Sequence, residues 1–159
     1  MILDERMEFA DAAVAFGALG HALIGDVIDL QELGRDPGNG EPLFFVVTVD
    51  TEIITAGVAG TLRFKLVSDA AAAIAVDGTA TEHYVSHDFI TDDTAANAPE
   101  LNAGGVPVAV ALPIEGVPYE RFLGVLVETV TTATTAGNIS AFLTHDVARW
   151  KAKPNALGA

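Results

Sequence analysis

One segment in the first half of the chain alternates between apolar and charged side chains. Leu62, Phe64 and Leu66 fall at every second position, and Arg63 and Lys65 lie between them. Successive side chains of a β-strand face opposite ways, so this pattern is typical of a strand with one buried and one exposed face. The segment therefore predicts a sheet that covers an apolar core on one side.

Further short segments have strand character, and Gly, Pro, Asn and Asp separate them. The expected strands are residues 12–16, 22–30, 43–49, 61–67, 79–86, 106–112, 122–132 and 139–144. The first of these could instead be a short helix, since alanine is plentiful there. Asp69 precedes a run of alanines, which predicts an N-cap and one short helix. Residues 91–105 are polar and rich in Gly, Ala and Asn, and we expect a long loop there.

These segments predict an all-β fold, an antiparallel β-sandwich that is jelly-roll-like, with at most one or two short helices. An immunoglobulin-like strand order and a small barrel stay open as alternatives. The length of 159 residues predicts a single domain. We expect an N-terminal arm over residues 1–20, the sandwich over residues 21–147 and a C-terminal tail over residues 148–159.

The charge of the chain is strongly negative, −14 from 22 acidic and 8 basic residues. This balance opposes binding to nucleic acid and to anionic membranes, and it favours a basic partner surface. The absence of cysteine excludes disulfides and thiolate catalysis. The first residues are acidic where a signal peptide would be basic, and no run approaches the roughly 20 apolar residues of a membrane span. We therefore expect synthesis and folding in a cytoplasm.

Two expected strands are apolar on both faces. In one, Phe44 and Val46 alternate with Phe45 and Val47; the strand at residues 122–132 behaves likewise. A sandwich strand normally has one wet face, so something should cover the outer side. The N-terminal arm, the loop at 91–105 and another subunit are the candidates.

Residue types that could carry chemistry do not form a known catalytic pattern. His83 and His87 would lie about 13 Å apart along a strand, too far to share one metal ion. His145 and Asp146 resemble part of a dyad, but no serine lies in a nucleophile-elbow motif. We therefore expect no enzyme activity, no cofactor and no metal.

The remaining acidic and glycine-rich motifs have ordinary structural explanations. Asp26 with Asp29, and Asp92 with Asp93, do not fit the acidic spacing of an EF-hand. The glycine-rich stretch at residues 34–40 lacks the Gly-Lys-Ser/Thr ending of a phosphate-binding loop and predicts a turn.

Interface residues are the better candidates for function. Trp and Arg are enriched at interface hot spots, and the tail carries a Trp flanked by bases, although this Trp could equally fold back onto the sandwich. A Tyr-Glu-Arg-Phe run could likewise serve strand entry or contact. The candidate contact residues are Ile2, Leu3, Arg6, Tyr119, Arg121, Phe122, Arg149, Trp150 and Lys151.

An ordered set of motifs along the chain resembles one family of phage proteins. The motifs are residues 1–8, 23–30, 38–43, 66–69, 73–75, 77–78, 111–113, 118–125, 141–144 and 150–151. Together they resemble the capsid cement (decoration) proteins of tailed phages, of the Bordetella-phage type.

This resemblance implies a jelly-roll-like virion protein on the outer capsid surface that clamps neighbouring capsomers. Its partners would be the major capsid protein of a tailed phage and a second copy of itself, as a homodimer or other homo-oligomer. Two alternatives are a jelly-roll module that binds carbohydrate or a host surface, and a metal-dependent enzyme of cupin type.

Overall fold

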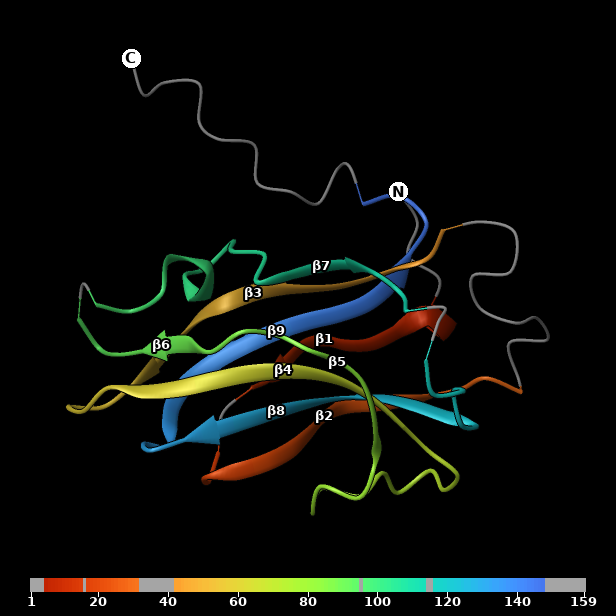
Figure 1. Cartoon of the computed structure of the whole chain (residues 1–159). Helices are drawn as coiled ribbons and strands as arrows, with labels where there is room; N and C mark the ends of the chain where they lie inside the picture. The colour runs from red at the N-terminus through yellow and green to blue at the C-terminus, as the bar shows by residue number, and fades with distance from the viewer. Residues whose placement is uncertain (1–4, 16, 32–41, 95, 114–115, 148–159) are drawn as a thin grey trace.

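The computed structural model describes residues 5–15, 17–31, 42–94, 96–113 and 116–147. These residues form two antiparallel sheets packed face to face, so the predicted β-sandwich is confirmed (Figure 1). The first sheet contains, in spatial order, β1 (Glu8–Val14), β9 (Thr134–Thr144), β3 (Phe44–Thr55) and β7 (Val108–Ala111). The second contains β2 (Gly20–Asp29), β8 (Phe122–Val130), β4 (Gly60–Asp69) and β5 (Thr81–Val85), with β6 (Phe89–Thr91) also paired to β4.

Strands β5 and β6 act as one interrupted strand. Both pair with the same edge of β4, and Ser86 between them donates its backbone N–H to the Phe64 carbonyl at 2.9 Å. Counting them as one gives eight strands, with strands 1-8-3-6 in one sheet and 2-7-4-5 in the other. This is the strand order of a jelly roll. Neither the immunoglobulin-like order nor the small barrel describes this molecule.

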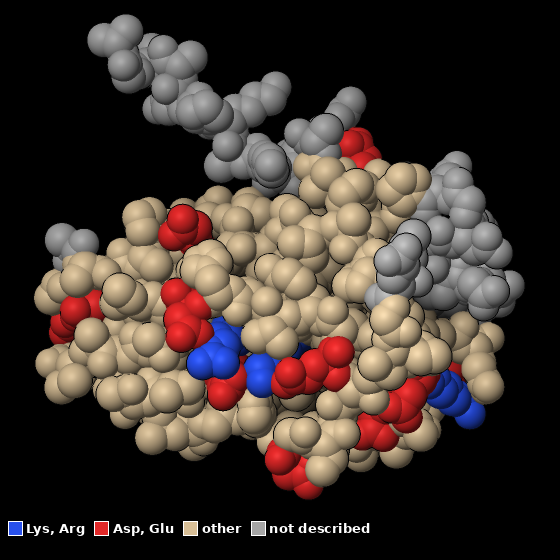
Figure 2. Space-filling view, viewed as in Figure 1, with Lys and Arg blue, Asp and Glu red and all other residues tan. Residues whose placement is uncertain are grey.

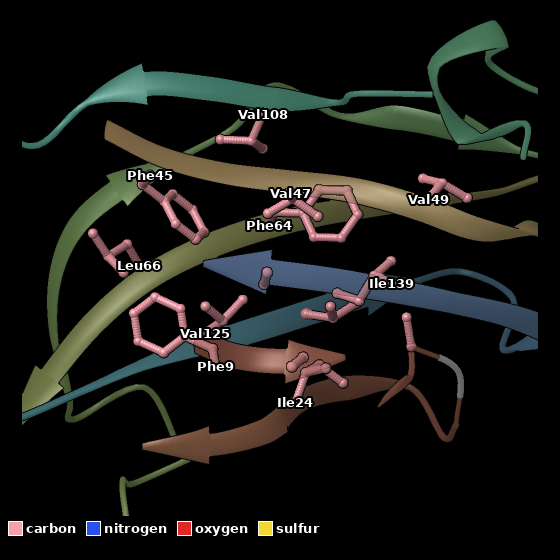
Figure 3. Packing of buried hydrophobic residues seen from close by; sticks show 14 of the residues in the cluster. Phe9, Ile24, Phe45, Val47, Val49, Phe64, Leu66, Val108, Val125 and Ile139 are labelled. Atoms are coloured by element: carbon pink, nitrogen blue, oxygen red, sulfur yellow. The ribbon is translucent and has the colours of Figure 1, made fainter. Parts of the chain in front are cut away.

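The core lies between the sheets and is built by alternate residues of facing strands. Leu62, Phe64 and Leu66 are fully buried in it, as the alternating pattern predicts. Phe45 of β3 and Phe9 of β1 meet edge to face, with ring centroids 6.1 Å apart (Figure 3). Such pairs add to the free energy that aromatic burial contributes.

Strand β1 belongs to the sandwich although we expected residues 1–20 to form an arm. Phe9 is buried in the core, and the strand pairs with β9 along its length, with two irregularities of register. The strand begins earlier than the expected strand at 12–16, because Phe9 and Ala10 are the residues that β1 buries against the rest of the sandwich. Residues 1–4 of the expected arm, and the expected tail at 148–159, lie outside the described residues.

No helix forms at the alanine run after Asp69. The Asp69 carboxylate accepts backbone N–H groups from Ala71 at 3.0 Å and Ala75 at 3.1 Å, as a cap would, but the chain bends instead. Ile74 packs back onto the outer face of the second sheet, over Gly124. Tertiary burial of Ile74 thus outweighs the helix propensity of alanine. The only helices in the described part of the chain are two 3₁₀ turns, η1 (Glu5–Met7) and η2 (Pro99–Leu101).

The strands with two apolar faces are covered within one chain. Leu126, on the outer face of β8, is 3% exposed and clusters with Ile74 and Ala80 of the β4–β5 connection. Val46 and Phe142 are paired neighbours of β3 and β9 outside the central core cluster, and both are buried. The doubly apolar strands therefore do not require a second subunit.

Candidate interaction surfaces

The predicted contact residue Tyr119 anchors a loop to the sandwich. Its ring stacks on His83 with centroids 3.9 Å apart, and its hydroxyl donates to the Pro113 carbonyl oxygen at 2.8 Å. Burial raises the pKa of Tyr119 to about 12, so the hydroxyl stays protonated and keeps this bond at neutral pH. Most of the Tyr119 side chain is therefore packed against its own chain.

Arg121 and Phe122 join the start of β8 to the end of β2. The Arg121 Nη2 donates to Oδ2 of Asp29 at 2.6 Å, and its Nε lies 3.1 Å from both carboxylate oxygens. The guanidinium also lies 4.8 Å from the centre of the Phe122 ring. A bidentate Arg–Asp pair has fixed geometry, so it orients the strand entry. The Arg121 side chain keeps 45% of its surface exposed.

Ser68, His83 and Glu120 form a second link between the same loop and the sheet. The Ser68 hydroxyl lies 2.7 Å from His83 Nε2 and accepts the Glu120 backbone N–H at 3.0 Å. A Ser–His contact can activate a nucleophile, but Ser68 is completely buried and no substrate could reach it. Burial lowers the pKa of His83, although the Glu120 charge opposes this, and the imidazole stays neutral in its structural role.

A row of charged side chains crosses the outer face of the second sheet. Lys65 is buried, and its ammonium lies 2.6 Å from Glu82 Oε1, 3.0 Å from Glu128 Oε2 and 3.2 Å from His21 Nε2. Arg63, two residues earlier in β4, pairs with Asp88 and lies 3.7 Å from Glu128. The charged half of the alternating segment therefore forms an ion-pair network.

The pKa values of this network follow from its geometry. Burial lowers the pKa of Lys65, but its contacts with Glu82 and Glu128 raise the pKa by more, so the net shift is upward. Burial raises the pKa of Glu128, but Lys65, Arg63 and His21 together outweigh it, and the net shift is downward. Both groups are therefore charged throughout the neutral range.

The three basic side chains of the described β2–β9 region are already paired with acidic groups. Arg63, Lys65 and Arg121 each have a carboxylate partner within the chain. Figure 2 shows the few basic groups of one face flanked by acidic ones. Phosphate binding needs available Lys and Arg, and these three offer none to a polyanion.

Exposed apolar side chains gather at one end of the second sheet. Ile90 of β6 and Val130 of β8 pair with Thr61 from its two sides, and Leu19 directly precedes Gly20, which pairs with Thr129. Val58 lies in the hairpin that leads into β4. We call Leu19, Val58, Ile90 and Val130 the end patch; their exposed fractions run from 37% to 62%.

The end patch has no recognisable pattern in the sequence. Its members are isolated apolar residues at four separate places in the chain, and single exposed valines are common. Only the strand register brings Ile90 and Val130 to either side of Thr61.

The histidines that could suggest a metal site are separated by the fold. His83 stacks on Tyr119, whereas the ring of His87 packs on Phe89 with centroids 4.1 Å apart. His145 Nδ1 lies 3.0 Å from the Pro42 carbonyl oxygen. In the part of the chain that the structure describes, no group of three or more His, Asp or Glu residues could hold a metal ion.

The remaining candidates bear on contact and on carbohydrate binding. Arg6 lies exposed in η1, whereas the other candidate contacts at the chain ends, Ile2, Leu3, Arg149, Trp150 and Lys151, fall outside the described residues. Every aromatic side chain within the described ranges is buried or half-buried. A sugar-binding platform needs exposed aromatic faces, and these ranges supply none. Also within them, no helix has the length and apolar character to span a bilayer.

The strand order defines the class of the molecule as a jelly-roll β-sandwich. A family model, Bbp16, which describes a family of Bordetella phage proteins, matches residues 10–143. The chain belongs to the Bbp16 family, and this membership indicates a phage structural protein. A comparison with curated proteins found no match.

Proposed function

We propose that this protein is a capsid cement protein that binds the outer surface of an assembled phage shell and joins neighbouring capsomers. The observation that carries the proposal is the family match over residues 10–143, which coincides with a complete jelly-roll sandwich. The proposal includes a non-enzymatic role, in which the protein acts only through its interfaces.

The physical mechanism is linkage between binding and lattice stability. A subunit that binds the assembled shell, but not free capsid protein, stabilises the shell by its binding free energy. At a concentration 100 times the Kd this amounts to about 2.7 kcal/mol per site. Many copies, each touching more than one capsomer, would add avidity.

The charges of the described surface support such a partner. The net charge of −14 opposes nucleic acid and anionic membranes as partners, and the bases of the sandwich are already paired. The same proposal includes a second copy of the chain, as a homodimer or other homo-oligomer.

The direct test is co-sedimentation of the purified protein with shells of its phage's major capsid protein, before and after shell expansion. We expect saturable binding to expanded shells and weaker binding to unexpanded ones. Bovine serum albumin, which is also acidic, controls for trapping in the pellet. Absence of saturable binding to both shell forms would contradict the proposal.

A further inference from the structure

Four chain connections meet at the end of the molecule that carries the end patch. Their described residues are 15 and 17–19, 56–59, 92–94 and 96–107, and 131–133, which belong to the β1–β2, β3–β4, β6–β7 and β8–β9 connections. The register brings them together, because Val14 pairs with Asn138, Thr55 with Thr134 and Gly60 with Thr91. Jelly-roll loops at one end of a sandwich form a single surface, as binding loops on a rigid scaffold do.

The centre of this surface is apolar. Ile90 and Val130 are separated by one strand, β4, so their side chains lie roughly 10 Å apart on the same face. Val58 is 62% exposed at the tip of the neighbouring hairpin, and Thr55 Oγ1 holds that hairpin by donating to the Val58 carbonyl at 3.0 Å. Several apolar groups that cluster at one end, on rigid strands and a bonded turn, are characteristic of a protein contact.

The rim of the same surface is acidic. Asp93 Oδ2 accepts the Gly57 backbone N–H at 3.3 Å, so a carboxylate lies beside Val58. Glu52 Oε1 accepts a hydrogen bond from Asn97 Nδ2 at 3.2 Å, and Asp92 is the neighbour of Asp93 in the chain. Within the described residues none of these three carboxylates has an ion-pair partner, and their charges are available to a partner.

The charge of the rim selects the occupant. A second copy docked through this end would bring like carboxylates together, which opposes association. A partner with an apolar centre and a rim of Lys or Arg would satisfy both parts of the surface. Arg63 of the same chain does not neutralise the acidic rim, since it pairs with Asp88 and lies near Glu128.

We propose that the end patch and its acidic rim are the docking surface for a protein with an apolar centre and a basic rim. This inference rests on the proposed function. In it, the partner with the basic rim is the outer surface of the phage shell. Burial of the end patch supplies affinity, and the carboxylates supply orientation and rapid encounter.

Two matched variants test the inference. Val58→Asp places a charge in the patch, and Val117→Asp places the same charge on a valine of equal exposure, 63%, in the β7–β8 connection at the opposite end. We expect Val58→Asp to weaken binding to expanded shells by about 30-fold, the loss of one hot-spot residue. Val117→Asp should bind within about twofold of the wild type. Higher salt should weaken wild-type binding, because the rim pairs are exposed.

Each outcome decides the inference separately from the proposed function. If the wild type does not bind shells, the proposed function fails and this inference fails with it. If the wild type binds and both variants bind equally well, or if Val117→Asp alone binds weakly, the docking surface lies elsewhere and only the inference fails. If the wild type is a dimer and Val58→Asp is a monomer, the end patch serves self-association. That result would contradict the inference that the patch binds a protein with a basic rim. Ile90→Asp replaces Val58→Asp if the latter lowers the melting temperature.

Discussion

Lys65 is the residue on which the charged face of the second sheet depends. Its stem is buried in the sheet while its ammonium contacts Glu82, Glu128 and His21. Removal of one partner from a buried ion pair is costly because it leaves an uncompensated charge, whereas exposed pairs contribute little. Glu128 is mostly buried and Glu82 is nearly half exposed, so their two bonds to Lys65 should differ in energetic weight.

We predict that Lys65→Met lowers the free energy of unfolding by about 3 kcal/mol at pH 7. The matched control Glu82→Gln, which removes only the exposed partner, should cost less than about 1 kcal/mol. Urea unfolding followed by circular dichroism measures both. Equal small losses for the two variants would show that the network adds nothing beyond a surface pair.

The pH dependence of this network has a definite sign. The pKa of Glu128 is lower in the folded protein, so its stabilisation is present above its ordinary pKa of about 4.3 and is lost as pH falls through the folded value. The pKa of Lys65 is higher in the folded protein, so its stabilisation is present below about pH 10.4 and is lost as pH rises through the folded value. The cost of Lys65→Met should therefore shrink at pH 4, where Glu128, without its contact to Lys65, takes up a proton.

At the scale of elements, Gly25 allows β1 and β2 to cross closely where the two sheets meet. Its φ of +66° is disfavoured for other residues, and a Cβ there would lie 2.0 Å from the Phe9 carbonyl oxygen. The register of β2 against β8 also shifts between Ile24 and Ile28. Gly25 lies within this irregularity of the register.

We predict that Gly25→Ala lowers the free energy of unfolding by about 2–5 kcal/mol, the combined cost of backbone strain and overpacking. Gly57→Ala is the control, since its φ of +76° is similar but nothing lies within 4 Å of an added Cβ. It should cost about 1–2 kcal/mol. Hydrogen exchange of the β1 amides should accelerate only in Gly25→Ala, and an equal effect of the two substitutions would exclude the clash.

Local patterns predicted some elements well and others poorly. The alternation around Phe64 identified β4 and both of its faces, because a strand with one wet face leaves a period of two in the sequence. The alanine run after Asp69 predicted a helix wrongly, since burial of Ile74 over Gly124 is a tertiary effect. Strand β6 was also missed, because three residues carry no measurable period.

At the scale of the whole molecule, the strand count and turns predicted a sandwich, but only the pairing of β9 with β1 on one side and β3 on the other established the jelly-roll order. The contact candidates at residues 119–122 were recognisable from residue type, yet Tyr119 packs inward and Arg121 bonds Asp29. The end patch depends on strand register and could not be seen in the sequence. Composition predicts a basic partner surface from the excess of 22 acids over 8 bases, and this stays a prediction.

The cement role is best tested by the thermal disruption temperature of expanded shells with and without saturating protein, followed by scanning calorimetry. A cement protein binds the intact lattice and stabilises it by mass action, so the temperature should rise with protein concentration until the sites are full. Val58→Asp at the same concentration should produce a smaller rise than Val117→Asp. An unchanged disruption temperature at concentrations that saturate binding would contradict the cement role.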